Sequence, residues 1–346
     1  MRRRITAMVL FAAMMTAVFS GCGRPQREEP APVMAEAEEG RESTSKRDEE
    51  ETERTKETIT VLAKETDYYP DGSIFCWEEY EYDSEGYQTK LTFYNADGSR
   101  GFWYEYEYDS AGIPTHTCYE ADGSIGGWSK VECDSAGNPT KFIDYYANGS
   151  INEWTEWEYD SAGNQTRHTS HSSDGSISSW YEYEYNSAGK WTKEIDYDPS
   201  GNVRYWKEYE YDSEGKRTKC TSYSSDGSIS SWTECEYNSA GNLTKEAVYS
   251  SDGEISSWGE CEYDDAENRT SEVRYESDGS IYYRIEYEYD SAGNRTSEVW
   301  YESDGSIKSW YGYEYDSAGN QTKEIAYYSD GNILWQKEYI TIERVR

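Results

Sequence analysis

Residues 289–320 read YDSAGNRTSEVWYESDGSIKSWYGYEYDSAGN, and this stretch decides the fold. It holds two kinds of turn signal, Asp-Ser-Ala-Gly-Asn and Asp-Gly, and the segments between them are rich in Tyr, Trp and β-branched residues. Both signals are typical of a three-residue hairpin loop, in which a type I turn is followed by a glycine in the left-handed conformation. Two such turns in one period predict a β-hairpin.

The Asp-Gly signal recurs at a constant interval along the chain, except that one interval is shorter by a single position. Its eleven occurrences, including an Asn-Gly and a Ser-Gly variant, are Asp71-Gly72, Asp97-Gly98, Asp122-Gly123, Asn148-Gly149, Asp174-Gly175, Ser200-Gly201, Asp226-Gly227, Asp252-Gly253, Asp278-Gly279, Asp304-Gly305 and Asp330-Gly331. The second signal lies between them, starting at Asp83, Asp109, Asp134, Asp160, Asn186, Asp212, Asn238, Asp290 and Asp316. A fixed period of about 26 residues indicates a tandem array. We therefore predict about eleven hairpin repeats over residues 59–346.

One turn departs from the pattern. The variant Asp264-Asp265-Ala266-Glu267 has lost the glycine. Because a left-handed backbone is unfavourable for residues with a Cβ, this turn is expected to be strained or of another type.

Side chains alternate along each repeat when positions are counted from the Asp of the Asp-Gly turn. Ile at +3 and Tyr at −3, +9 and +11 fall on odd positions, whereas Glu at +8 and +10 and Thr at −8 fall on even ones. Successive side chains of a strand point to opposite faces, so a Tyr/Ile face and a Glu/Thr face are predicted. A column of tryptophans at +6 crosses the Glu/Thr face: Trp77, Trp103, Trp128, Trp154, Trp180, Trp206, Trp232, Trp258 and Trp310.

The length of the repeat predicts a coiled sheet. Crossing two strands advances the lattice by about 24 residues with loops of this kind, while the repeat itself advances by about 26. The excess shears every hairpin in the same direction, and a uniformly sheared, twisted sheet tilts its strands and coils. We expect an all-β fold in which one long antiparallel sheet forms a spiral or partly closed shell, with the Tyr/Ile face inside.

Two of the repeats resemble a known family. Residues 289–296 (YDSAGNRT) and 315–322 (YDSAGNQT) are similar to the Tyr-Asp repeats of RHS proteins, whose pattern is YDxxGN/RxT, and the likeness extends over the whole repeat array. It implies a coiled β-shell. The period is longer than is usual in that family, and the chain ends at Arg346 without a core and toxin segment, so the toxin role is not carried over. The Asp-Gly-Ser-Ile half bears a weaker similarity to MORN-like antitoxin repeats.

The N-terminus carries the parts of an export signal. Residues 2–4 are arginines and residues 5–19 form an apolar run that is too short to span a bilayer comfortably. The following Phe19-Ser20-Gly21-Cys22 resembles the lipobox of bacterial lipoproteins, with Phe19 where Leu is usual. The resemblance implies that residues 1–21 are a signal peptide and that a lipid on Cys22 holds the exported protein on the cell envelope, facing outside the cytoplasm. The alternative is an ordinary secretory signal that happens to contain a cysteine.

Composition separates a tether from the repeat array. Residues 22–58 contain no aromatic side chain and are expected to form a disordered, charged tether. Residues 67–346 hold all 36 Tyr and all 13 Trp, and their 22 basic and 56 acidic residues give a formal charge of −34. So acidic a body excludes nucleic acid as a partner and repels anionic lipid. Polycations, divalent ions and neutral glycans remain possible partners.

No catalytic or metal site is predicted. His116, His168 and His171 occupy no repeated position, and they have neither a nearby nucleophile nor a zinc-type spacing. The turn aspartates suggest calcium, but each already has a role in its turn and no dense DxDxD loop exists. No cofactor is therefore expected, and calcium remains only an alternative.

The cysteines are expected to be free thiols, most of them acting as small hydrophobic residues on the Tyr face. Cys118 and Cys133, like Cys220 and Cys235, are separated by an odd number of positions, which places the two members of each pair on opposite faces. Cys235 and Cys261 share a face but lie two strands apart, which is beyond the reach of a disulfide.

The tryptophan column is the one feature that the hairpin pattern does not require. Its rings could pack under another layer, or they could form a ladder of platforms for sugar rings. We expect a surface-tethered, non-enzymatic β-repeat scaffold or adhesion lipoprotein. One alternative is a glycan- or cell-wall-binding protein that uses the tryptophan ladder, and another is an immunity or antitoxin-like partner of a secreted toxin. The expected partners are the membrane, through the lipid anchor, and a glycan or another envelope protein.

Overall fold

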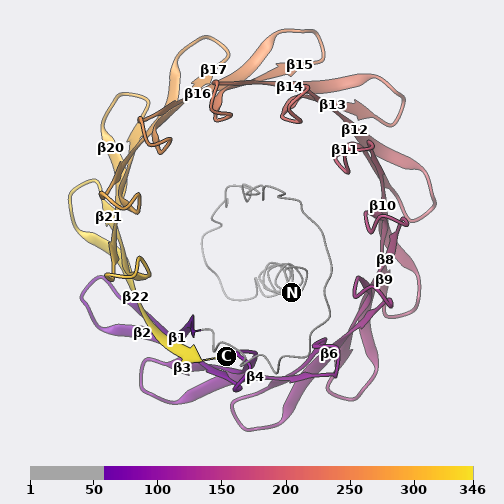
Figure 1. Ribbon diagram of the computed structural model, residues 1–346, viewed down its shortest axis with the longest axis vertical. Helices are drawn as coiled ribbons and strands as arrows, with labels where there is room; N and C mark the ends of the chain where they lie inside the picture. Colours follow the sequence, from indigo (N-terminus) through magenta and orange to yellow (C-terminus); the bar gives the residue numbers. More distant parts are fainter. Residues whose placement is uncertain (1–57, 346) are drawn as a thin grey trace, which may run out of the picture. The chain divides into compact units, whose positions relative to one another are not determined.

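The computed structural model describes residues 58–345. All of these residues belong to one compact unit, Thr55–Arg346. These form 22 antiparallel strands, each paired with the next along the chain (Figure 1). The strands are β1 (Thr58–Tyr68), β2 (Ile74–Tyr82), β3 (Gln88–Asn95), β4 (Arg100–Tyr108), β5 (Pro114–Tyr119), β6 (Ile125–Cys133), β7 (Pro139–Tyr146), β8 (Ile151–Tyr159), β9 (Gln165–Ser172), β10 (Ile177–Tyr185), β11 (Trp191–Tyr197), β12 (Val203–Tyr211), β13 (Arg217–Ser224), β14 (Ile229–Tyr237), β15 (Leu243–Ser250), β16 (Ile255–Tyr263), β17 (Arg269–Glu276), β18 (Ile281–Tyr289), β19 (Arg295–Glu302), β20 (Ile307–Tyr315), β21 (Gln321–Tyr328) and β22 (Ile333–Val345).

The sheet closes on itself. Strand β1 pairs with β2 on one side and with β22 on the other, so the hairpins form a closed barrel with two rims of turns. At the closing seam, Lys337 of β22 forms ion pairs with Glu65 and Asp67 of β1, the latter at 3.4 Å. The hydroxyl of Tyr68 donates to Glu338 at 2.7 Å. The predicted all-β fold with one coiled antiparallel sheet is thus confirmed. The sheet closes completely instead of forming a spiral or a partly closed shell.

The turns adopt the predicted geometry. In the turn at Asp226, Oδ1 accepts from the backbone N–H and the hydroxyl of Ser228 at 2.9 and 2.6 Å, and Gly227 has a φ of 86°. At the opposite rim, Asp290 Oδ1 accepts from the backbone N–H groups of Ala292 and Asn294 at 2.8 and 2.9 Å. Each aspartate therefore organises its own turn, as the sequence predicts. We call the two edges of the barrel the Asp-Gly rim and the Asp-Ser-Ala-Gly rim.

The turn without a glycine keeps the same geometry as the others. Glu267 has a φ of 66°, the only positive φ of a non-glycine residue among residues 58–345. Its N–H still donates to the Asp264 carbonyl at 3.0 Å, as the turn glycines do elsewhere. The turn is therefore strained rather than of another type. We expect Glu267→Gly to raise the free energy of unfolding by about 1 kcal/mol.

Urea titration followed by circular dichroism measures this gain, and Glu214→Gly is the matched control because Glu214 lies in an equivalent turn but not at its left-handed position. An unchanged or lowered midpoint for Glu267→Gly would contradict the strain.

The hairpins are sheared as predicted. Strand β13 lies between two strands that carry equivalent tryptophans. Its Tyr223 is paired with Trp206 of β12, whereas its Thr221, two residues earlier, is paired with Trp232 of β14. Each hairpin therefore shifts the register by two positions in one direction, which tilts the strands around the ring.

The prediction of faces is wrong for half of the strands. Tyr223, predicted to face away from the tryptophans, lies directly opposite Trp206. The cause is one extra residue at each end of a hairpin: the pairing skips Thr218 between Lys219 and Arg217, and it skips Ser230 between Ser231 and Ile229. Each β-bulge reverses the alternation of facing. The Tyr column at −3 therefore shares a face with the tryptophans.

The isoleucines at +3 are also placed differently from the prediction. Seven of them are exposed near the Asp-Gly rim instead of being buried: Ile74, Ile125, Ile151, Ile229, Ile255, Ile281 and Ile307. They lie in the bulged segment next to the turn, where the regular alternation of the strand has not yet begun. The tyrosines at +9 and +11 lie an odd number of positions from the tryptophans at +6 on the same, unbulged strand, as Tyr209 and Tyr211 do from Trp206, and so they face the opposite side of the sheet, as predicted.

Candidate functional site

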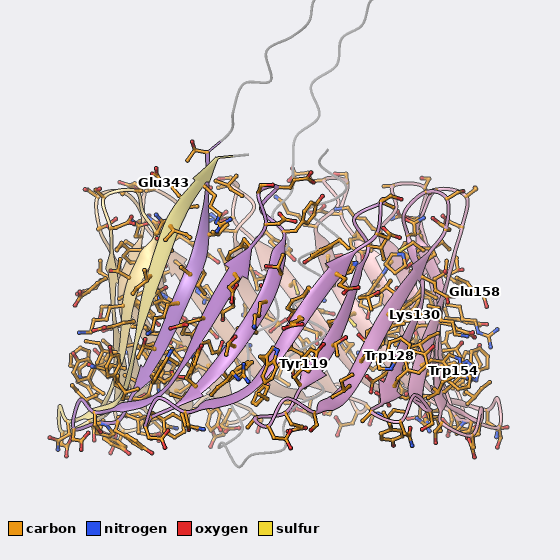
Figure 2. All side chains as sticks on the ribbon, turned by 90° about the horizontal axis from the view of Figure 1, so that it is seen from below. Tyr119, Trp128, Lys130, Trp154, Glu158 and Glu343 are labelled. Atoms are coloured by element: carbon orange, nitrogen blue, oxygen red, sulfur yellow. The ribbon has the colours of Figure 1, made fainter. Side chains whose placement is uncertain are left out.

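The tryptophan column lies on the outer wall of the barrel. Figure 2 shows Trp128 and Trp154 on this side, above the same rim, with Lys130 and Glu158 farther along the wall. Each of the nine tryptophans is stacked on the aromatic residue at −3 of the next strand, a Tyr in eight cases and His171 beside Trp154. The ring centroids are 3.6–5.0 Å apart and the interplanar angles are 1–14°. This pairing fixes the orientation of every ring in the column.

The tryptophans also cover the turns. A Cβ built on Gly227 would lie 3.7 Å from the Trp206 ring, and five other Trp–Gly pairs have separations of 3.6–3.9 Å. Six of the nine rings have a Lys or Arg over them at 3.7–5.7 Å. Trp206, for example, has Tyr223 of β13 on one side and Lys193 of β11 on the other. A sugar ring would therefore reach most ring faces only by displacing such neighbours.

Charged side chains cover the rest of the outer wall. Six Lys–Glu ion pairs, which join equivalent positions of neighbouring strands, have N–O distances of 2.8–3.8 Å. Beyond them, an exposed glutamate at +10 is repeated around the ring: Glu81, Glu107, Glu132, Glu158, Glu184, Glu210, Glu236, Glu262, Glu288 and Glu314. Exposed ion pairs contribute at most about 1 kcal/mol each to the stability of a fold. Because the glutamates at +10 lie beyond these pairs, the wall is chiefly an acidic surface.

Tyrosine hydroxyls tie successive turns together on the inner wall. Eight tyrosines at +11 donate to a main-chain carbonyl 20 residues earlier in the chain, with distances of 2.7–2.9 Å. Tyr211 of β12, for instance, bonds to the carbonyl of Trp191 at the start of β11. Burial, as the largest cause, raises the pKa of Tyr237 to about 12. These hydroxyls are therefore structural groups that stay protonated at neutral pH.

Two of the three histidines face the interior, and His116 is the more deeply buried. It is 6% exposed, and its Nδ1 lies 2.6 Å from the hydroxyl of Ser129. Burial lowers the pKa of His116 to about 4, so the imidazole is neutral at pH 7. His168 stacks between Trp157 and Tyr181, and burial lowers its pKa as well. Both positions indicate packing, whereas the third histidine, His171, belongs to the outer aromatic column.

Ion pairs satisfy the charges on one arc of the inner wall. Glu272 is 7% exposed and accepts from Arg269 at 2.7 Å and from Arg274 at 3.0 Å. Arg274 continues to Glu246 at 3.0 Å, and Arg269 donates to the Tyr287 hydroxyl at 3.0 Å. These residues therefore form one ion-paired network on this arc of the wall.

The six cysteines within residues 58–345 form no disulfide, as predicted. The prediction that Cys220 and Cys235 lie on opposite faces is wrong. Cys220 is paired with Thr233 of β14, and Thr233 lies two residues before Cys235 and therefore on the same face of that strand. The same bulges account for the error. Burial, as the largest cause, raises the pKa of Cys118, Cys220 and Cys261, so these thiols are held protonated.

The described part of the chain offers no constellation for a metal. No group of three or more His, Cys, Asp or Glu side chains converges within residues 58–345. Nor does this part contain a helix that could cross a membrane. The predicted signal peptide, the lipidation site Cys22 and nearly all of the predicted tether lie outside the described residues.

Comparison with known proteins gives only weak similarities. No protein-family model and no curated protein matches the sequence. Among solved structures, TcdB2-TccC3 is 14% identical with a TM-score of 0.30 and covers 77% of this chain, which spans only 19% of that chain. A porin-like protein from Bacteroides uniformis is 13% identical with a TM-score of 0.30, covering 81% of this chain and 98% of its own. A structure described as the eukaryotic initiation factor is 9% identical with a TM-score of 0.33, covering 81% and 89%.

Similarities at this level carry no argument about activity or ancestry. The likeness to RHS repeats therefore stays a prediction, whereas the closed array of hairpins is a property of the structure itself.

Proposed function

We propose that this protein is a non-enzymatic scaffold of the bacterial cell envelope, exported and held there by a lipid on Cys22, and that its barrel presents a repeated surface to binding partners. The observation that supports it most is the repetition itself. The same acidic and aromatic pattern is displayed around a closed ring, while charged groups on one arc of the inner wall are engaged with one another. Such a ring is suited to display rather than to turnover.

Anchoring is tested by labelling growing bacteria with a palmitate analogue. The wild-type chain is expected to carry the label and to sediment with membranes, whereas Cys22→Ser loses both properties. Cys220→Ser is the matched control, since Cys220 is a half-buried thiol of the inner wall. Equal labelling of wild type and Cys22→Ser would contradict the anchor.

Glycan binding is the second candidate function. It is supported by the nine tryptophans of the column, which occupy the same position in their repeats, so that a long polymer could contact several at once. Titration of the full chain with soluble peptidoglycan fragments and with β-glucan, followed by tryptophan fluorescence, tests this function. Saturable quenching would favour it, and no change with either polymer would leave the scaffold without a glycan ligand.

A further inference from the structure

The two rims of the barrel differ strongly in exposed apolar surface. Within residues 58–345, 17 large hydrophobic side chains are exposed, and only Trp191, Ile340 and Ile342 lie away from the Asp-Gly rim. The other fourteen are within five positions of an Asp-Gly turn: Tyr69, Ile74, Phe75, Phe102, Ile125, Tyr146, Ile151, Tyr205, Ile229, Ile255, Ile281, Tyr282, Ile307 and Tyr328. Exposed apolar side chains that gather along one edge of a folded protein are candidates for an interaction site.

The same rim is strongly acidic. The turn aspartates stand fully exposed beside the apolar side chains, and hydrogen bonds from the following serine lower the pKa of Asp226 and Asp278. Glu120, Glu276 and Glu302 add carboxylates within two positions of their turns. The rim therefore alternates apolar side chains with permanent negative charge.

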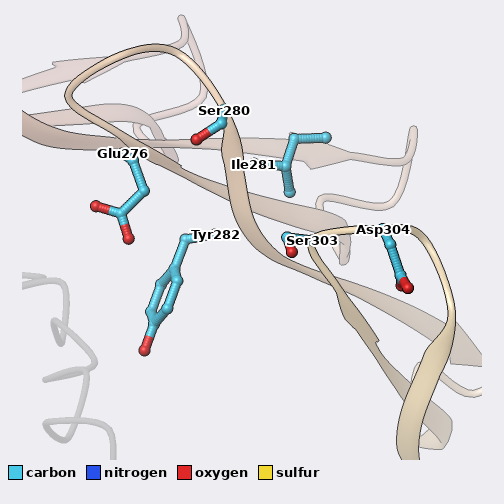
Figure 3. Close-up of a pocket in the computed structure, with 6 residues that line it drawn as sticks. All are labelled: Glu276, Ser280, Ile281, Tyr282, Ser303 and Asp304. Carbon is cyan, nitrogen blue, oxygen red and sulfur yellow. The ribbon is translucent and has the colours of Figure 1, made fainter.

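At one place on the rim, two adjacent hairpins form a depression in which both properties meet. It has a volume of about 410 Å³ and is lined by Glu276, Ser280, Ile281 and Tyr282 of one hairpin and by Ser303 and Asp304 of the next (Figure 3). Tyr282 is 61% exposed and Ile281 is 38% exposed. Two carboxylates beside an aromatic ring and an isoleucine are suited to a Lys or Arg side chain with an apolar neighbour.

We propose that the Asp-Gly rim is a docking surface for a polypeptide that is both basic and apolar, such as an amphipathic helix with Lys or Arg beside Leu or Ile. This inference gives the scaffold function proposed above its class of partner, and it rests on that function. Charge selects the occupant: a second copy of the chain would bring two rings of carboxylates together, and an anionic lipid surface would be repelled. A basic segment gains both apolar burial and ion pairs.

The test titrates the full chain with a fluorescent helical peptide of about 18 residues composed of Lys and Leu, followed by anisotropy. The matched peptide of Glu and Leu is expected not to bind. Replacing Ile229, Ile255 and Ile281 by Ser is expected to raise the Kd at least about tenfold. Exposed isoleucines outside the rim provide the control, since Ile340→Ser with Ile342→Ser should leave the Kd unchanged.

The charge is tested separately. Replacing Asp226, Asp278 and Asp304 by Asn preserves the turns, because Asn148 already accepts the same two bonds from Ser150 at 2.9 and 2.7 Å. This triple variant is expected to raise the Kd about tenfold at low salt and less at high salt. Its control has the same net charge but alters the other rim, with Asp212, Asp290 and Asp316 replaced by Asn, as occurs naturally at Asn186.

Equal weakening by the two charge variants would mean that net charge alone attracts the peptide, and this would overturn the proposal. An unchanged Kd for the peptide after replacement of Ile229, Ile255 and Ile281 by Ser would overturn it as well. Binding of neutral phosphatidylcholine vesicles that depends on Ile229, Ile255 and Ile281, without binding of the peptide, would assign the rim to lipid instead. These results are independent of the palmitate labelling of Cys22, so failure of the docking surface and failure of the envelope anchor are distinguishable.

Discussion

Replacing Trp180, Trp206 and Trp232 together by alanine is expected to destabilise the barrel by several kcal/mol. Each ring stacks on a tyrosine of the next strand, with centroids 3.7, 4.9 and 5.0 Å apart. Loss of a buried aromatic side chain costs about 3–5 kcal/mol, and these half-buried rings are expected to contribute about 2 kcal/mol each. Urea unfolding of the full chain, followed by far-ultraviolet circular dichroism, measures the effect.

The control is Trp191→Ala, which removes an exposed tryptophan that is not part of the column. Its effect on the unfolding midpoint is expected to be clearly smaller than one third of that of the triple variant. If the triple variant unfolds at the wild-type urea concentration but no longer binds glycans, the column serves recognition and not packing.

Acidification is expected to weaken the barrel through His116, in addition to the general effect of the carboxylates. The folded-state pKa of His116 is about 4 because of burial, whereas the ordinary pKa of a histidine is 6.5. A lowered pKa means that the folded state favours the neutral ring. The stabilisation is complete above pH 6.5 and is lost as the pH falls towards 4, with a maximum of about 3 kcal/mol.

The double variant His116→Phe with Ser129→Ala removes both partners of the buried hydrogen bond and retains an aromatic ring beside Tyr104. The difference in unfolding free energy between wild type and this variant is expected to move by about 2–3 kcal/mol in favour of the variant between pH 7.5 and pH 4.5. Ser129→Ala alone is the control and should retain the wild-type pH dependence. A constant difference across this range would show that His116 does not titrate within the fold.

The architecture is largely predictable from the sequence because it is local and repeated. Asp226-Gly227-Ser228 specifies its turn with its own side chains, and the constant period of the repeat specifies the shear. The pairing of β1 with β22 is not predictable in this way, because it depends on how eleven tilts add up around the ring. It is completed by contacts between the two ends of the described chain, such as the ion pair of Lys337 with Glu65.

The prediction of faces is wrong for the strands that carry the −3 and −8 positions, and the sequence contains the reason. Threonine recurs at −8 in most repeats, and Thr218 is the residue that the pairing skips; its hydroxyl donates to the carbonyl of Glu210 at 3.3 Å. The one shorter repeat has Pro114 near that position, and β4 pairs with β5 without any register shift. The repeat that is one residue shorter is thus also the repeat that lacks this bulge. The length of a repeat therefore indicates whether the bulge is present.

The candidate site was only partly predictable. The tryptophan column is visible as a pattern in the sequence, but simple alternation places the tyrosines that cover it on the wrong face, because it takes no account of the bulges. Simple alternation does not predict the apolar Asp-Gly rim, because it places the isoleucines at +3 in the interior. Their position one residue after the Gly-Ser of the turn was the available signal that they lie at an edge.

Closure at β1 and β22 has a consequence for how the chain can be cut and rejoined. A linear stack of repeats has end units with one neighbour and must protect them, whereas in a ring every hairpin is flanked on both sides. The position of the chain termini is then a matter of connectivity rather than of stability. Joining residue 345 to residue 58 through a short linker and opening the chain at another Asp-Gly turn should give a circular permutant with the same barrel.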